Sequence, residues 1–219
     1  MDVNESGPRQ AAQRVRTIAR LAGIALALVL AQPAKAVEEP SYRVIESAPP
    51  IEIREYAAYA VAETRVAGEF ADVGNTGFRR LFGYISGENR GSTPIAMTAP
   101  VTQQAAPEQI AMTAPVTQQA DGESYRIGFV LPAPYTAASA PVPTSPDVRI
   151  VEVPARRVVA IRYSGRWSDA NYREALAELL AFARARKLAL TGEPVYARYD
   201  PPFMPWFLRR NEILIEIAP

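Results

Sequence analysis

The chain contains the same short pattern twice, and this duplication constrains its fold more than any other feature. Glycine, any residue, an aromatic residue, a small residue and aspartate follow one another at 68–72 and again at 165–169, 97 residues apart. Alternating apolar residues before each copy, at 51–66 and at 148–163, predict two strands. After each copy, apolar residues recur at the spacing of a helix that buries one stripe. The predicted stripes are Phe78, Leu81, Phe82 and Ile85 in the first half, and Tyr172, Leu176, Leu179, Leu180 and Ala183 in the second.

Each half then returns to strands. The predicted ranges are 123–131 in the first half, and 194–199 and 212–217 in the second. Helix caps are expected at Ser168 or Asp169 and at Asn75 or Thr76, because their side-chain oxygens accept hydrogen bonds from first-turn amides. Two strands, a helix and further strands, present twice, predict an α+β fold in which a pseudo-symmetric sheet or open barrel carries two helices.

A proline-rich segment separates the halves. Five prolines lie within 132–146, and proline donates no amide hydrogen to a sheet. This segment is therefore predicted to cross the surface between half-repeats at about 41–131 and 147–217.

A second repeat lies inside the first half. The sequence Ile-Ala-Met-Thr-Ala-Pro-Val-Thr-Gln-Gln occurs at 95–104 and again at 110–119. A proline within a strand is compatible only with an edge strand or with a bend in the strand. Two short, bent segments are expected, with Met97 and Met112 in similar environments.

The N-terminus has the order of a secretory signal peptide. Three arginines precede an apolar run at 21–31, and the small-residue site Ala34-Lys35-Ala36 follows. The run is about 11 residues long, whereas a helix that crosses a bilayer needs about 20. We expect cleavage after Ala36, a single mature domain at 37–219, and a periplasmic or secreted location. An uncleaved N-terminal anchor is the alternative.

Composition excludes several classes of function. The mature chain would have 19 basic and 21 acidic residues, a formal charge of −2, so it lacks the basic excess that nucleic-acid binding needs. The chain has no cysteine and no histidine. These absences exclude disulfides, thiolate metal sites, histidine-dependent hydrolases and a histidine-ligated haem.

Four motifs carry a family resemblance. They are the Ile-Ala-Met-Thr-Ala-Pro-Val segment, Gly-Phe-Val-Leu-Pro at 128–132, Tyr-Ser-Gly at 163–165, and Arg-Tyr-Asp-Pro-Pro at 198–202 followed by Arg-Arg-Asn-Glu at 209–212. In this order they resemble the SOUL haem-binding family, over about residues 40–217. The resemblance implies two βαββ-type repeats, with a helix from each packed on a distorted barrel or sheet like that of regulatory-factor effector-binding domains.

The resemblance also implies binding of haem or another tetrapyrrole, against the first helix and the loop after the Pro201-Pro202 pair. Apolar contacts and basic side chains would hold it. The implied binding residues are Phe78, Leu81, Phe82, Ile85, Phe203, Met204, Trp206 and Phe207, with Met97, Met112 and Arg209 as further candidates. A basic residue of some relatives corresponds to Met204 here, which removes one ion pair to a haem propionate.

Each candidate also has a structural interpretation. An ordinary core is the more common explanation of the first-helix stripe, and Met97 and Met112 are either core residues or thioether ligands of haem iron. Arg209 and Arg210 pair either with a propionate or with Glu212 and the sheet edge. Tyrosine is the other available type of iron ligand, and the sequence does not rank Tyr84, Tyr135, Tyr163 and Tyr172.

No motif indicates catalysis. Asp72 and Asp169 recur in both halves, but their place beside the helix starts fits stabilisation by the helix dipole. The leading interpretation is an exported binder or carrier of haem or another porphyrin that uses no histidine ligand. The alternatives are an enzyme that inserts or removes the metal of a tetrapyrrole, and a protein of the same fold that binds another amphiphile or a protein partner.

Overall fold

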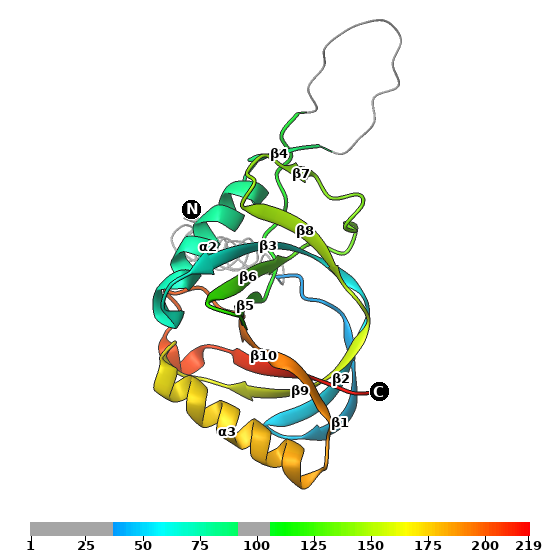
Figure 1. Cartoon of the computed structure of the whole chain (residues 1–219), viewed down its shortest axis with the longest axis vertical. Helices are drawn as coiled ribbons and strands as arrows, with labels where there is room; N and C mark the ends of the chain where they lie inside the picture. The colour runs from blue at the N-terminus through cyan, green and yellow to red at the C-terminus, as the bar shows by residue number, and fades with distance from the viewer. Residues whose placement is uncertain (1–36, 92–105) are drawn as a thin grey trace, which may run out of the picture. The chain divides into compact units, whose positions relative to one another are not determined.

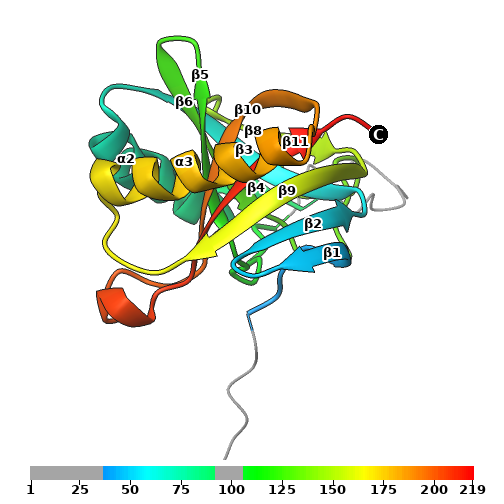
Figure 2. The ribbon, with the colours of Figure 1, turned by 90° about the horizontal axis from the view of Figure 1, so that it is seen from below.

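The computed structural model describes residues 37–91 and 106–219, which form an α+β unit (Figure 1). A nine-stranded antiparallel sheet curls round and carries both helices on one face (Figures 1 and 2). In chain order the elements are β1 (Tyr42–Ala48), β2 (Ile51–Tyr56), β3 (Tyr59–Ala67), α2 (Phe70–Ile85), β4 (Asn89–Arg90), β5 (Val116–Asp121), β6 (Ser124–Val130), β7 (Val142–Pro143), β8 (Val148–Val153), β9 (Arg156–Tyr163), α3 (Asp169–Ala185), β10 (Leu190–Arg198), the short 3-10 helix η1 (Trp206–Leu208) and β11 (Asn211–Ile217).

The strand order confirms the two pseudo-symmetric halves. The sheet runs β1-β2-β9-β11-β10-β5-β6-β3-β8. Strands β2, β3, β5 and β6 of the first half correspond, in that order, to β8, β9, β10 and β11 of the second half. When each of these eight strands is replaced by its counterpart, the order after β1 is the same as the original order read from the other end of the sheet. The halves also exchange strands, because β2 pairs with β9 and β8 pairs with β3. Each half therefore completes the sheet of the other.

Helix α2 packs on β3, β6 and β8, but not through the stripe that the sequence predicts. Leu81 and Ile85 are buried as expected, whereas Phe78 and Phe82 are 37% and 46% exposed. The reason is Gly77, where a Cβ atom would lie 2.4 Å from Ile127 Cγ1. Because this glycine faces the sheet directly, the helix approaches closely and turns the two phenylalanines to its outer side.

The helix starts differ between the halves. Helix α2 begins at Phe70, and Glu69 at its N-cap makes no side-chain capping bond, so the caps predicted at Asn75 or Thr76 are wrong. Helix α3 is capped by Ser168, whose hydroxyl accepts from the Asn171 amide, as predicted. The stripe of α3 is confirmed, since its members pack against one core cluster of β2, β9, β10 and β11. Those members are Tyr172, Leu176, Leu179, Leu180 and, buried in the helix, Ala183.

The predictions for the proline-containing segments are confirmed in part. Residues 132–146 form the predicted crossover, although its Val142–Pro143 pairs with β4 as a two-residue strand. In the repeat copy at 110–119, the strand β5 begins only after Pro115. Met112 is 48% exposed and therefore does not fill the core. The copy that contains Met97, at 95–104, lies outside the described residues, as does the predicted signal peptide at 1–36. Within 37–91 and 106–219, no helix is long and apolar enough to cross a membrane.

Candidate functional site

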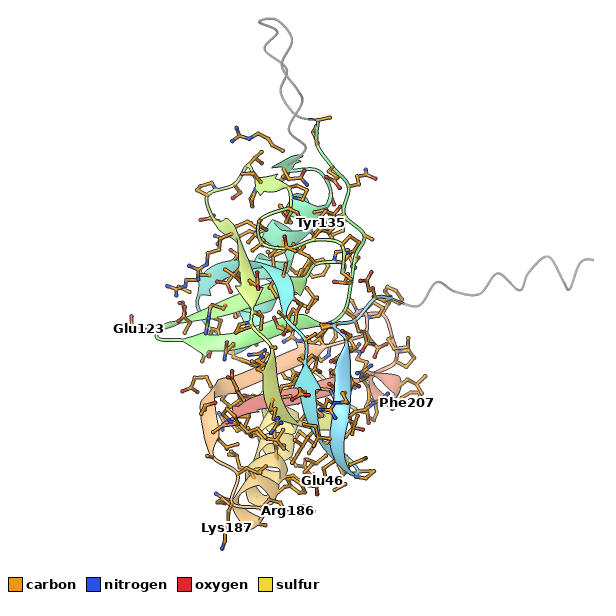
Figure 3. All side chains as sticks on the ribbon, turned by 90° about the vertical axis from the view of Figure 1, so that its right-hand side faces the viewer. Glu46, Glu123, Tyr135, Arg186, Lys187 and Phe207 are labelled. Atoms are coloured by element: carbon orange, nitrogen blue, oxygen red, sulfur yellow. The ribbon has the colours of Figure 1, made fainter. Side chains whose placement is uncertain are left out.

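The loop between β10 and β11 presents large apolar side chains to solvent. Phe203 is 85% exposed, and Trp206 and Phe207 are about half exposed. The rings of Trp206 and Phe207 meet edge to face with centroids 5.6 Å apart. Phe207 lies at the margin of the unit (Figure 3). These apolar side chains thus lie on the segment between β10 and β11 and are exposed, as the sequence predicted. Their contact with a ligand stays a prediction.

Backbone and arginine contacts hold this loop in place. Arg209 donates from Nε to the Met204 carbonyl at 2.8 Å and from Nη2 to the Pro202 carbonyl at 2.5 Å. The Gly165 amide donates to the Trp206 carbonyl at 3.0 Å, which ties η1 to the segment before α3. Arg209 therefore braces the loop from within, a role that neither interpretation of the sequence included.

The exposed rings of α2 form a second aromatic surface. Phe78 and Phe82 stack with centroids 5.9 Å apart, and Phe78 also meets the buried Phe129 at 5.2 Å. Leu81 and Ile85, on the same helix, belong to the core beneath them. No ring contact among the described residues joins this pair to the loop aromatics. The structure brings the predicted site residues into two surfaces rather than one.

The tyrosines named as candidate iron ligands are held in their neutral form. Burial raises the pKa of Tyr84 and of Tyr163, and burial also raises the pKa of Tyr172. A hydrogen bond to Glu108 is the largest of the effects that raise the pKa of Tyr135 to about 12. Because a tyrosine binds ferric iron as the phenolate, these shifts work against all four.

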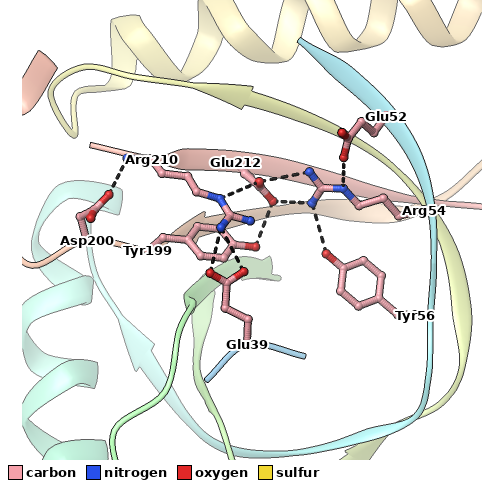
Figure 4. Close-up of polar contacts among 8 residues, drawn as sticks. All are labelled: Glu39, Glu52, Arg54, Tyr56, Tyr199, Asp200, Arg210 and Glu212. Atoms are coloured by element: carbon pink, nitrogen blue, oxygen red, sulfur yellow. Dashed lines mark hydrogen bonds and ion pairs between the residues drawn. The ribbon is translucent and has the colours of Figure 1, made fainter. Parts of the chain in front are cut away.

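The concave face of the sheet, opposite the helices, holds a polar cluster of which the sequence indicated only the pairing of Arg210 with Glu212 (Figure 4). Glu212 is fully buried and accepts two hydrogen bonds from Arg54, at 2.6 and 3.1 Å. It also accepts from Arg210 Nε at 3.0 Å and from the Tyr199 hydroxyl at 2.9 Å. Arg210 in turn contacts Glu39 at 2.8 Å. The interpretation that Arg210 pairs with Glu212 is confirmed.

The charges in this cluster compensate one another. Burial by itself raises the pKa of Glu212, but the hydrogen bonds and positive charges of Arg54 and Arg210 outweigh burial, so this pKa lies below its ordinary value. The sequence signals for this cluster were charged residues within two strands, Glu212 near the start of β11 and Arg54 in β2. Their pairing depends on the relation of strands 158 residues apart in the chain.

Two hollows lie along β3. One, of about 420 Å³, is lined by the segment at 38–41, the β2–β3 turn and the crossover; the other, of about 450 Å³, lies on the concave face of β3, β6 and β8. The second contains Arg126, Arg149 and Arg156. These arginines are neutralised by Asp121, Glu63 and Glu216. The residues that the family resemblance implied as binding line neither hollow, and no group of three acidic residues among the described ones is arranged to hold a metal ion.

Residues 37–216 match the protein family described as SOUL heme-binding protein. The chain belongs to the SOUL heme-binding protein family. A curated relative of this SOUL protein is heme-binding protein 2 of Mus musculus, which is 27% identical over 195 residues, 83% of this chain and 91% of the mouse protein.

Solved structures share the fold of this SOUL protein. The C-terminal domain of EcmrR superposes with a TM-score of 0.57 at 13% identity, over 81% of this chain and 98% of that domain. A protein described as a hydrolase from Listeria innocua superposes with a TM-score of 0.52 at 12% identity, over 77% and 91% of the two chains. At such identities these matches establish the fold class alone.

Proposed function

We propose that this SOUL protein is an exported binder of haem or a related tetrapyrrole, which it holds by apolar contact and without a histidine ligand. The observation that carries the proposal is the braced loop with Phe203, Trp206 and Phe207 turned to solvent. Large apolar groups exposed together mark ligand or partner surfaces more often than chance exposure does. The exposed Phe78 and Phe82 of α2 supply a second flat aromatic surface.

The residues at the loop fit both the flat apolar ring of a tetrapyrrole and its acidic side groups. The aromatic rings match a flat, apolar macrocycle, for which offset or edge contacts between rings are favourable. The acidic side groups of a porphyrin need cations, and the guanidinium of Arg166 lies 5.7 Å from the Trp206 ring centroid, with no carboxylate within 4 Å in the described part of the chain. Haem, when bound, would supply the redox and ligand chemistry of its iron.

Iron coordination contributes little in this proposal. The chain has no histidine, and the raised pKa values of the candidate tyrosines oppose phenolate ligation. Met204 and Met112 remain as thioether candidates, together with Met97 outside the described residues. Protoporphyrin without iron should therefore bind nearly as well as haemin.

Haemin titration of the purified protein, followed by the Soret band and by quenching of tryptophan fluorescence, tests the proposal. Burying a large aromatic side chain contributes about 1.5 to 3 kcal/mol, or roughly 10- to 150-fold in a binding constant. Trp206→Ala should weaken binding by about that factor, and Phe82→Ala tests whether the second aromatic surface also contacts the ligand. Ile45→Ala, which removes an exposed apolar side chain from the edge strand β1, is the matched control.

Two results would contradict the proposal. Unchanged haemin affinity in both alanine variants would remove these aromatic surfaces from the site, provided circular dichroism shows that the variants fold. A strong preference for haemin over protoporphyrin would show that a side chain coordinates the iron. Export has its own test, because mass spectrometry of the mature protein from the periplasm should find Val37 at the N-terminus.

A further inference from the structure

Three arginines around the exposed loop have no acidic partner. Arg166, Arg198 and Arg209 form no ion pair within 4 Å among residues 37–91 and 106–219, whereas the buried Arg54 and the half-buried Arg210 of the concave face both bind Glu212. An arginine is charged at every physiological pH. Three cations thus lie around this loop with no carboxylate within 4 Å among the described residues, while the loop's own carboxylate, Asp200, accepts from the Arg210 amide at 2.6 Å.

Arg198 is the most constrained of the three. Its guanidinium carbon lies 5.0 Å from the Tyr196 ring centroid and 4.9 Å from that of Trp167. On the α2 side it lies against bare backbone, because a Cβ atom at Gly74 would come within 3.0 Å of its Nη1. Among the described residues its hydrogen-bond partners are neutral, because Nη2 donates to Gln118 Oε1 at 3.3 Å and the side chain also forms a hydrogen bond with Tyr196.

The hydrogen bonding of Arg198 is also incomplete. Its Nε is buried and has no hydrogen-bond partner in the described part of the protein. Burial lowers the pKa of Arg198, while Tyr196 and Tyr163 act in the opposite direction and no carboxylate contributes. A partly buried guanidinium without a counter-charge costs free energy in the unliganded protein, and an anionic ligand would supply that counter-charge.

Arg209 and Trp167 connect Arg198 to the exposed aromatics. The guanidinium carbon of Arg209 lies 4.5 Å from the Trp167 ring centroid, so one indole contacts both arginines. Trp167 is itself fixed, since its Nε1 donates to Asn211 Oδ1 at 2.8 Å. Cations thus lie directly behind a loop that exposes Trp206 and Phe207.

We infer that Arg198, with Arg209 and Arg166, binds the carboxylate of a flat apolar ligand whose ring system rests on the loop aromatics. The inference rests on the proposed function and narrows it, because it requires an acidic side group on the ligand. Arginine binds carboxylates through charge-assisted hydrogen bonds, which are stronger than neutral ones. A haem propionate has this chemistry, and so does any planar aromatic acid.

Two pairs of probes test the inference with full-length protein. Protoporphyrin IX and its dimethyl ester differ only in their carboxylates, as do 1-pyrenebutyrate and 1-pyrenebutanol. In each pair the acid should bind about 10- to 150-fold more tightly than its neutral partner. Arg198→Met should remove most of that preference and leave the neutral probes unchanged.

Matched variants keep the result interpretable. Arg184→Met removes an exposed arginine from the far end of α3 and should change nothing. Arg166→Met should reduce the preference for acids by a smaller factor, and it provides a second test if Arg198→Met does not fold by circular dichroism.

The outcomes separate the two proposals. If pyrenebutyrate binds in an Arg198-dependent manner and no porphyrin binds, the inference stands and the proposed function fails. If protoporphyrin and its ester bind equally to the wild type and to Arg198→Met, the function stands and the inference is overturned. Acid preference that survives in both arginine variants would also overturn it.

Discussion

Two arginines, Arg54 and Arg198, lie on opposite faces of the same sheet and differ in what neutralises them. Arg54, on the concave face, is almost fully buried and forms two hydrogen bonds with Glu212. Arg198, on the helix side, is surrounded by Trp167, Tyr196 and backbone, with no carboxylate in reach among the described residues. A buried charge that only maintains the fold needs its partner within the chain. A charge that has no partner within the chain is available to a ligand, but it lowers the stability of the unliganded protein.

The largest expected difference is in stability. Arg54→Met leaves Glu212 buried beside only one remaining arginine, and breaking a buried ion pair in this way costs about 3 to 5 kcal/mol. We expect the free energy of unfolding, measured by urea denaturation, to fall by about that amount. If Arg54→Met lost no more stability than Arg198→Met, the two arginines would be equivalent for folding, and the contrast drawn between them would be wrong.

The second difference is in acid sensitivity. The pKa of Glu212 is lower in the folded protein than its ordinary value, so this carboxylate stabilises the fold above a pH of about 4.5. That stability is lost as the pH falls through the folded-state pKa, by at most about 1.4 kcal/mol per pH unit. Urea denaturation between pH 7 and pH 3 should therefore show a shallower acid loss for Glu212→Gln than for the wild type.

A neutral substitution elsewhere calibrates that measurement. Glu178→Gln removes an exposed carboxylate of α3 that forms no ion pair among the described residues. Its acid profile should follow that of the wild type. Parallel profiles for Glu212→Gln and the wild type would mean that the concave cluster does not depend on the ionised form of Glu212.

The smallest expected effect is the stability of Arg198→Met. Replacing a partly buried cation that has no carboxylate partner by an apolar side chain of similar length is expected to change the free energy of unfolding by less than about 1 kcal/mol, or to raise it. The measurement is urea denaturation without ligand. A loss of several kcal/mol would show that Arg198 maintains the fold, as Arg54 does.

The amino-acid sequence by itself determined the plan of this protein. The repeated Gly-x-aromatic-small-Asp pattern and its flanking periodicities predicted two equivalent halves, the stripe of α3 and the strands β6, β10 and β11, because these depend on residues close together in the chain. The motifs between residues 95 and 212 were sufficient to identify the family. The exposed loop aromatics were also foreseen, because prolines on either side exclude a regular helix.

The tertiary structure alone decided what depends on distant segments. The outward turn of Phe78 and Phe82 follows from the close approach of Gly77 to Ile127, which lies in another element. Pairing of Arg54 with Glu212 requires that the halves exchange strands, and no local pattern specifies that exchange. For the same reason the sequence did not reveal that Arg198 lacks a partner, since the neighbours of a charge are set by strand register and by which helix covers the strand.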